Sequence, residues 1–162
     1  MMIAALQFQL RSLRRQIEHL PASVYAGATV RSSGSVGQHV RHIADHARSL
    51  LALGTESDFS YDARLRGTRV ETDPVCAADE LVHLCVALED LDDLPFDRQV
   101  RLHIVTEPGR ASAEVMTTLG REIAFVIQHT IHHCALIAVL LDRAGVAVPE
   151  RFGVAPSTPV RA

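Results

Sequence analysis

The apolar periodicity of residues 118–144 is the feature that most constrains what this chain can fold into. In the stretch TLGREIAFVIQHTIHHCALIAVLLDRA, apolar positions recur at the three-and-four spacing of a helix with one buried face. The positions that follow this spacing are Leu119, Ile123, Val126, Ile127, Thr130, Ile137, Leu140 and Leu141. His129 and His133 join the same face, because residues four apart lie one helical turn apart. Two imidazoles at this spacing can bind one metal ion, although a core histidine satisfied by a hydrogen bond is the commoner arrangement.

Length and composition indicate one globular domain covering residues 1–162. The chain has 162 residues, of which 48% are hydrophobic and 22% charged, so it can bury a substantial core without disulfides or a metal. Its net charge of −3 gives no electrostatic footprint for nucleic acid. We therefore expect no nucleic-acid partner.

The cysteines and the amino terminus bear on the compartment. Cys76, Cys85 and Cys134 are odd in number and in no CxxC spacing, which argues against a disulfide framework or a cysteine zinc site. Residues 1–20 lack the order of a signal peptide, since their basic residues follow the apolar part. No apolar run approaches the length of a membrane span. These features predict a cytoplasmic protein without a membrane partner.

Amphipathic patterns and stop signals predict three further helices. Pro21 ends the first helix because proline cannot continue the hydrogen-bond ladder. Ser35 is a good N-cap for the second helix, and Gly54 stops it. The helices expected before the last one cover residues 2–20, 36–53 and about 76–91.

A short β-hairpin is expected between the third and the last helix. Residues 99–106 alternate apolar and polar side chains, residues 107–110 form a turn, and residues 111–116 form the return strand. The tail, residues 148–162, holds three prolines and no period, so we expect it to be irregular. The chain is thus predicted to be all-α, as a four-helix bundle with a small β-hairpin inserted before the last long helix.

A second group of histidines lies on the helix expected over residues 36–53. His39, His42 and His46 run beside its apolar stripe, and a solvated histidine-rich edge would show the same pattern. In a bundle, one of them can meet the pair on the last helix, because facing side chains of different helices converge in the core. By helical geometry, His39 and His46 lie nearer the centre of the stripe than His42. Three neutral histidines would leave a metal position open for water or substrate, as catalytic sites do.

Three short motifs carry a family resemblance. They are QHTIHH at residues 128–133, TLGRE at residues 118–122 and SVGQHVRHIAD at residues 35–45. Together they resemble the DinB-like superfamily, and the similarity extends over nearly the whole chain. The resemblance implies a four-helix bundle of the DinB-like type, often a homodimer. It also implies a divalent metal held by one histidine of the second helix and the HxxxH pair of the last.

Matched to these motifs, the implied metal ligands are His42, His129 and His133, with His46 and then His39 as alternatives on the second helix. Imidazole ligands suit several divalent metals, among which zinc and nickel are the first to expect. His132 lies on a different side of its helix and is expected at an interface or behind the ligands.

Three neighbouring residues are candidates for catalysis or substrate binding. Asp45, three residues after His42, is a possible general base. Arg64 and Arg66 can bind an anionic small-molecule substrate or a low-molecular-weight thiol cofactor. A solvated surface is the commoner role for Asp45, and a solvated loop or a dimer contact is at least as common for Arg64 and Arg66.

The function expected from these features is that of a metal-dependent enzyme. It is either a thiol-dependent transferase or isomerase, as the resemblance implies, or a hydrolase that uses metal-bound water. The alternative is a non-catalytic stress-response or binding module in which the metal is structural or absent. One fold hosts many functions, so the residues of the site have to decide.

Overall fold

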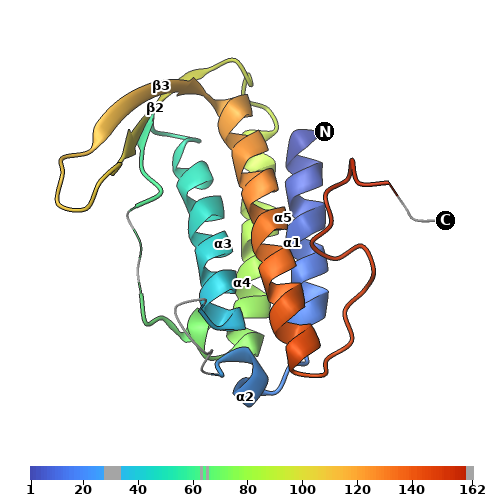
Figure 1. The fold of residues 1–162 in the computed structure, drawn as a ribbon. Helices are drawn as coiled ribbons and strands as arrows, with labels where there is room; N and C mark the ends of the chain where they lie inside the picture. Colours follow the sequence, from blue (N-terminus) through green and yellow to red (C-terminus); the bar gives the residue numbers. More distant parts are fainter. Residues whose placement is uncertain (28–33, 63, 65, 160–162) are drawn as a thin grey trace.

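Helices dominate the structure, at the places where the apolar spacing predicts them (Figure 1). The computed structural model describes residues 1–27, 34–62, 64 and 66–159. The α-helices within these residues are α1 (Met2–Ile17), α2 (Ala22–Tyr25), α3 (Val36–Ala52), α4 (Pro74–Ala87) and α5 (Leu119–Arg143). The short 3₁₀ helices are η1 (Arg69–Glu71) and η2 (Leu88–Leu91), and the strands are β1 (Asp58–Phe59), β2 (Gln99–Ile104) and β3 (Ala113–Thr118).

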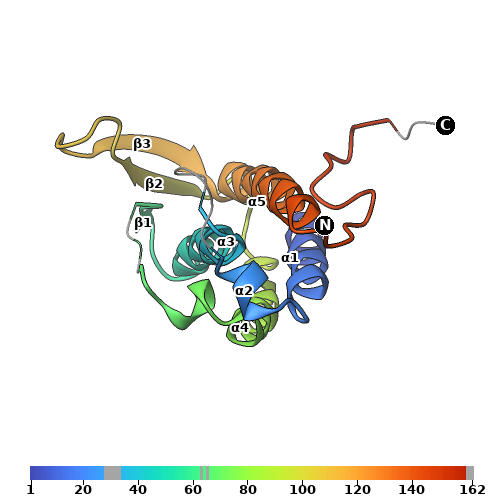
Figure 2. The ribbon, with the colours of Figure 1, turned by 60° about the horizontal axis from the view of Figure 1, so that its bottom comes forward.

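The four long helices α1, α3, α4 and α5 lie side by side (Figures 1 and 2). Helix α1 contacts α4 and α5, and α3 contacts the same two helices. Their apolar stripes form one core, which includes Leu6, Leu10, Leu13, Ile17, Ile43, Leu50, Leu81, Leu88, Ile123, Val126 and Ile137. Because α3 packs against α5, the two histidine groups of the sequence face each other.

The predicted cap of α3 is confirmed, and α5 has a side-chain cap as well. The Ser35 side chain accepts a hydrogen bond from the backbone N–H of Gln38, while the Gln38 side chain accepts one from the backbone N–H of Ser35. This reciprocal box satisfies two N–H groups that a helix start would otherwise leave unpaired. Thr118 caps α5 by accepting from the backbone N–H of Arg121. Both histidine-bearing helices therefore begin at positions fixed by their own sequence.

The sheet differs from the predicted hairpin. Strands β2 and β3 pair antiparallel as expected, but β1 pairs with β2 in parallel, so the sheet is mixed and has three strands in the order β1-β2-β3. The expectation of an all-α chain with only a hairpin is thus wrong in this respect, and the fold is mostly helical. A strand of two residues shows no alternation in the sequence, since its pairing with β2 alone defines it. The hairpin projects away from the helices (Figure 2).

Some helix ends also differ from the prediction. Helix α1 ends at Ile17 instead of Leu20; Pro21 disfavours helical conformation at Leu20, the residue directly before it. The third predicted helix begins at Pro74 and is α-helical to Ala87, after which η2 continues as a 3₁₀ turn. The sequence does not predict α2, which is too short for a period to be visible.

The C-terminal tail is irregular, as predicted, over the part that the structure describes. Phe152 is 6% exposed and packs into the core, which ties the tail to the helices. Gly153 adopts a positive φ of 72°, and a Cβ there would come within 2.4 Å of the backbone nitrogen of Ala135. The tail therefore lies directly against α5. Residues 160–162, the end of the predicted tail, lie outside the described residues.

Helix α5 is long and apolar enough, by length and composition, to cross a membrane, alone among the helices of the described residues. The expectation that no segment approaches this size is thus wrong. Core helices meet the same criteria, and α5 packs against α1 and α3 along its buried stripe. The finding is weak evidence for a membrane span.

Candidate metal centre

Three histidines from two helices converge at the contact between α3 and α5. His42 comes from α3, and His129 and His133 come from consecutive turns of α5. One nitrogen of each ring can be chosen so that the three atoms lie within 4.8 Å of one another. The Nε2 atoms of His42 and His129 are 2.8 Å apart. This arrangement can hold a metal ion, and it is made of the three residues that the motif comparison selects.

His46 forms a wall beside these three histidines. Its ring is 3% exposed and stacks between Tyr61 and His129, with centroid distances of 4.6 and 4.2 Å. Its Nδ1 lies 3.0 Å from the carbonyl oxygen of His42, a contact in which only the imidazole can donate. His46 is therefore packed into the core next to the site, while the less buried His42 contributes to the group of three.

His39 lies behind His133. The Nδ1 atoms of the two rings are 2.9 Å apart, so one of them donates and the other accepts. When a histidine binds a metal through Nε2, its Nδ1 keeps the proton and needs an acceptor. His39 can be that acceptor for His133. His132 is exposed, and its ring centroid lies 5.2 Å from that of His133, outside the group.

The histidines of the site are neutral at physiological pH. Burial is the first cause that lowers the pKa of His42 to about 2, of His46 to about 4 and of His133 to about 3. Burial also lowers the pKa of His129. Neighbouring histidines add to each shift, because a second positive ring nearby is unfavourable. Neutral imidazole is the form that binds metals.

One of the two candidate arginines, Arg64, lies next to the histidine group. One terminal nitrogen of its guanidinium is 3.3 Å from Nδ1 of His42, and its Nε donates to the carbonyl oxygen of Tyr61 at 2.8 Å. The second terminal nitrogen of the same guanidinium lies 3.6 Å from a carboxylate oxygen of Asp62. Arg66 is exposed, and the structure does not bring it to the histidines.

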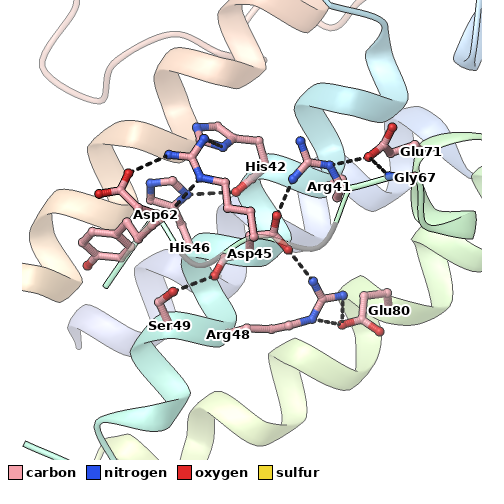
Figure 3. A network of polar contacts seen from close by, with 12 residues as sticks. Arg41, His42, Asp45, His46, Arg48, Ser49, Asp62, Gly67, Glu71 and Glu80 are labelled. Atoms are coloured by element: carbon pink, nitrogen blue, oxygen red, sulfur yellow. Dashed lines mark hydrogen bonds and ion pairs between the residues drawn. The ribbon is translucent and has the colours of Figure 1, made fainter. Parts of the chain in front are cut away.

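Asp45 faces a different set of partners (Figure 3). One carboxylate oxygen pairs with Arg41 and the other with Arg48 at 2.7 Å. Arg41 also pairs with Glu71 of η1, and Arg48 with Glu80 of α4. The structure therefore uses Asp45 to connect α3 with η1 and α4, and does not bring it into the histidine group. Its spacing of three and four residues from the two arginines is the sequence signal for this role.

Glu122 and Tyr61 connect the loop after α3 to α5. Glu122 is 3% exposed and accepts hydrogen bonds from the Tyr61 hydroxyl at 3.0 Å and from Thr117 at 2.8 Å. Burial, followed by the charge of Glu122, raises the pKa of Tyr61, so its hydroxyl stays protonated and can donate. The sequence around Glu122 does not predict this buried role, because its partner Tyr61 comes from a distant loop. This pair fixes the segment that carries Arg64.

The fold and the histidine group define a mostly helical protein with a possible three-histidine metal site. A family model described as the DinB family matches residues 2–154, and the chain belongs to this family. One curated relative, FK506-binding protein 5 from Rhizopus delemar, is 28% identical over 100 residues. That match covers 61% of this chain and 26% of the relative, so the chain spans about a quarter of that protein's length. No solved structure matches the chain.

Proposed function

We propose that this protein is a divalent-metal-dependent enzyme, built as a four-helix bundle of the DinB-like type, whose ion is held by His42, His129 and His133. The observation that carries the proposal is the convergence of three neutral imidazoles, with ligand nitrogens within 4.8 Å of one another. Zinc and similar ions bind histidine nitrogens at about 2 Å, so three such ligands around one ion fit this spacing. Membership of the DinB family supports the same site.

The number of ligands supports an enzyme over a structural metal protein. Within the described residues the group contains three histidines and no carboxylate or thiolate. Structural zinc sites are closed by four protein ligands, whereas catalytic sites keep a position for water or substrate. His46 lies outside this group, and its ring is stacked against that of His129.

The surrounding residues have separate tasks in this proposal. His39 orients His133, and the Tyr61–Glu122 hydrogen bond holds the loop on α5. Arg64 binds an anionic group of a small-molecule substrate next to the histidines, because a guanidinium matches the geometry of a carboxylate. The bound ion would supply a Lewis acid that lowers the pKa of a thiol or a water molecule. A thiol nucleophile makes the protein a transferase or isomerase, and water makes it a hydrolase.

Metal content tests the proposal directly. Untagged wild-type protein, His42→Ala, His133→Ala and the control His83→Ala are reconstituted with zinc or nickel, passed over a desalting column and analysed by elemental mass spectrometry. His83 is exposed on α4, away from the site. We expect about one ion per chain in wild type and control and little in the other two. Wild-type protein without metal after reconstitution would refute the proposal. Metal without turnover of thiol or hydrolysis substrates would support the non-catalytic alternative.

A further inference from the structure

His42 has a hydrogen-bond donor behind it where a metal ligand ordinarily has an acceptor. The guanidinium of Arg64 lies 3.3 Å from Nδ1 of His42 and has only N–H groups to offer. The Nδ1 atom must therefore present its lone pair. A neutral imidazole has a single N–H, so the proton of His42 is on Nε2. The 2.8 Å contact between Nε2 of His42 and Nε2 of His129 agrees with this, because one of these two nitrogens has to donate.

Metal binding through Nε2 of His42 requires the opposite tautomer. The lone pair then has to be on Nε2 and the proton on Nδ1, where an acceptor normally receives it. With Arg64 in its present place, two donors would face each other over the same short distance. His133 has no such conflict, because His39 can accept its proton.

We infer that a metal ion on His42 and the Arg64–His42 contact exclude each other, so that binding the ion frees the Arg64 guanidinium to bind a carboxylate ligand beside the metal. This inference rests on the proposed function and adds a coupling between its two ligands. The freed guanidinium stays near the site, since its Nε is held by the carbonyl oxygen of Tyr61. Tyr61 itself is fixed by Glu122 and by stacking on His46. Because the guanidinium is planar and rigid, it has to tilt as a unit about this hydrogen bond to leave His42.

The coupling works in both directions. If Arg64 has to leave His42 before the metal binds, the contact weakens metal binding, and a carboxylate that draws Arg64 away strengthens it. Hydrogen bonds to charged groups contribute enough to change an equilibrium by about tenfold to a hundredfold. Because Arg64 is half-buried, we expect the lower value, about tenfold.

Zinc affinity measured by competition with a chromophoric chelator tests this inference in three proteins: wild type, Arg64→Met and Arg66→Met. Both variants lose one positive charge of the same loop, but only Arg64 contacts His42. We expect Arg64→Met to bind zinc about tenfold more tightly than wild type and Arg66→Met to bind it equally well. Acetate, the carboxylate probe, is expected to tighten zinc binding by wild type and by Arg66→Met, and to leave Arg64→Met unchanged.

Nitrogen NMR of the histidine rings separates this mechanism from simple charge repulsion. In chelator-treated wild type, His42 should carry its proton on Nε2, and in the zinc-loaded protein on Nδ1. The inference is overturned if wild type and Arg64→Met bind zinc with equal affinity, or if Arg64→Met and Arg66→Met show the same increase in zinc affinity. It is overturned as well if Nδ1 of His42 stays unprotonated in the zinc-loaded protein. It is also overturned if acetate acts on Arg64→Met as on wild type. Failure of the proposed function looks different, because none of the three proteins would then bind zinc.

Discussion

The stability of the folded protein should fall between neutral and mildly acidic pH because burial lowers the pKa of several histidines, and the contribution of one of them, His46, can be measured separately. Its ring lies between Tyr61 and His129, and its pKa is lowered to about 4 by burial first and by the charge of His129 second. In the unfolded chain the ordinary value of 6.5 applies. Below about pH 6.5 the unfolded state therefore binds a proton that the folded state does not accept until about pH 4. Stability is present above the unfolded pKa and is lost as the pH falls toward the folded one.

The size of the loss follows from these two pKa values. For one group with a pKa of 6.5 unfolded and about 4 folded, the free energy of unfolding decreases by about 2 kcal/mol between about pH 7 and about pH 5. His46→Gln removes the titrating group at similar side-chain volume. The variant should therefore lose about 2 kcal/mol less than wild type over this interval.

Urea unfolding followed by circular dichroism, in the presence of a chelator, measures this difference. His83→Gln is the matched control, because His83 is exposed on α4, and it should show the wild-type loss. The chelator matters because metal bound to the native histidines would oppose protonation. If His46→Gln loses as much stability as wild type between the two pH values, the ring is not held neutral by burial, and the reasoning fails.

Three substitutions test the neighbours of the site. His39→Leu removes the acceptor behind His133 and should weaken zinc binding by about tenfold to a hundredfold in a chelator competition. Unchanged zinc affinity would show that His39 does not orient His133. Tyr61→Phe keeps the stacking but leaves the buried carboxylate of Glu122 with one donor fewer, so the free energy of unfolding measured in urea should fall by about 1–3 kcal/mol. An unchanged free energy of unfolding would contradict the role of this hydrogen bond. Asp45→Asn breaks a buried ion pair with Arg41 and should cost about 3 kcal/mol of stability while zinc affinity stays at the wild-type value. Unchanged stability together with weakened zinc binding would instead place Asp45 at the metal site.

The helices could be predicted because their signals are local. The last helix is expected over residues 118–144 and observed as Leu119–Arg143, since both its period and its cap are written in adjacent residues. The box formed by Ser35 and Gln38 fixes the start of α3 in the same way. Strand β1 could not be predicted, because its two residues become a strand only by pairing with Arg101 and Leu102 of β2.

On α3, helix geometry predicts which histidine is buried, whereas the family resemblance predicts which histidine binds the metal. The apolar stripe of α3 places His46 more centrally than His42, and His46 is indeed the more buried of the two. The resemblance selects His42, which lies with the pair from α5. Burial and metal binding are thus separate properties of neighbouring residues on one helix. The surroundings of Asp45 depend on Glu71 and Glu80, whose carboxylates pair with its arginine partners and come from later segments, so the sequence around α3 could not settle them.

A metal site of this kind needs two conditions that oppose each other, neutral imidazoles and access for a small molecule. Burial keeps imidazoles neutral, but a fully buried ligand set would be closed to substrate. In this protein different residues meet the two conditions. The buried rings of His46 and Tyr61, together with Phe125 stacked 5.3 Å from His129, exclude water on one side. The three candidate ligands are half-buried and border the segment that carries Arg64. A substitution in the buried wall should therefore change how readily the site takes up protons, whereas one among the ligands should abolish metal binding.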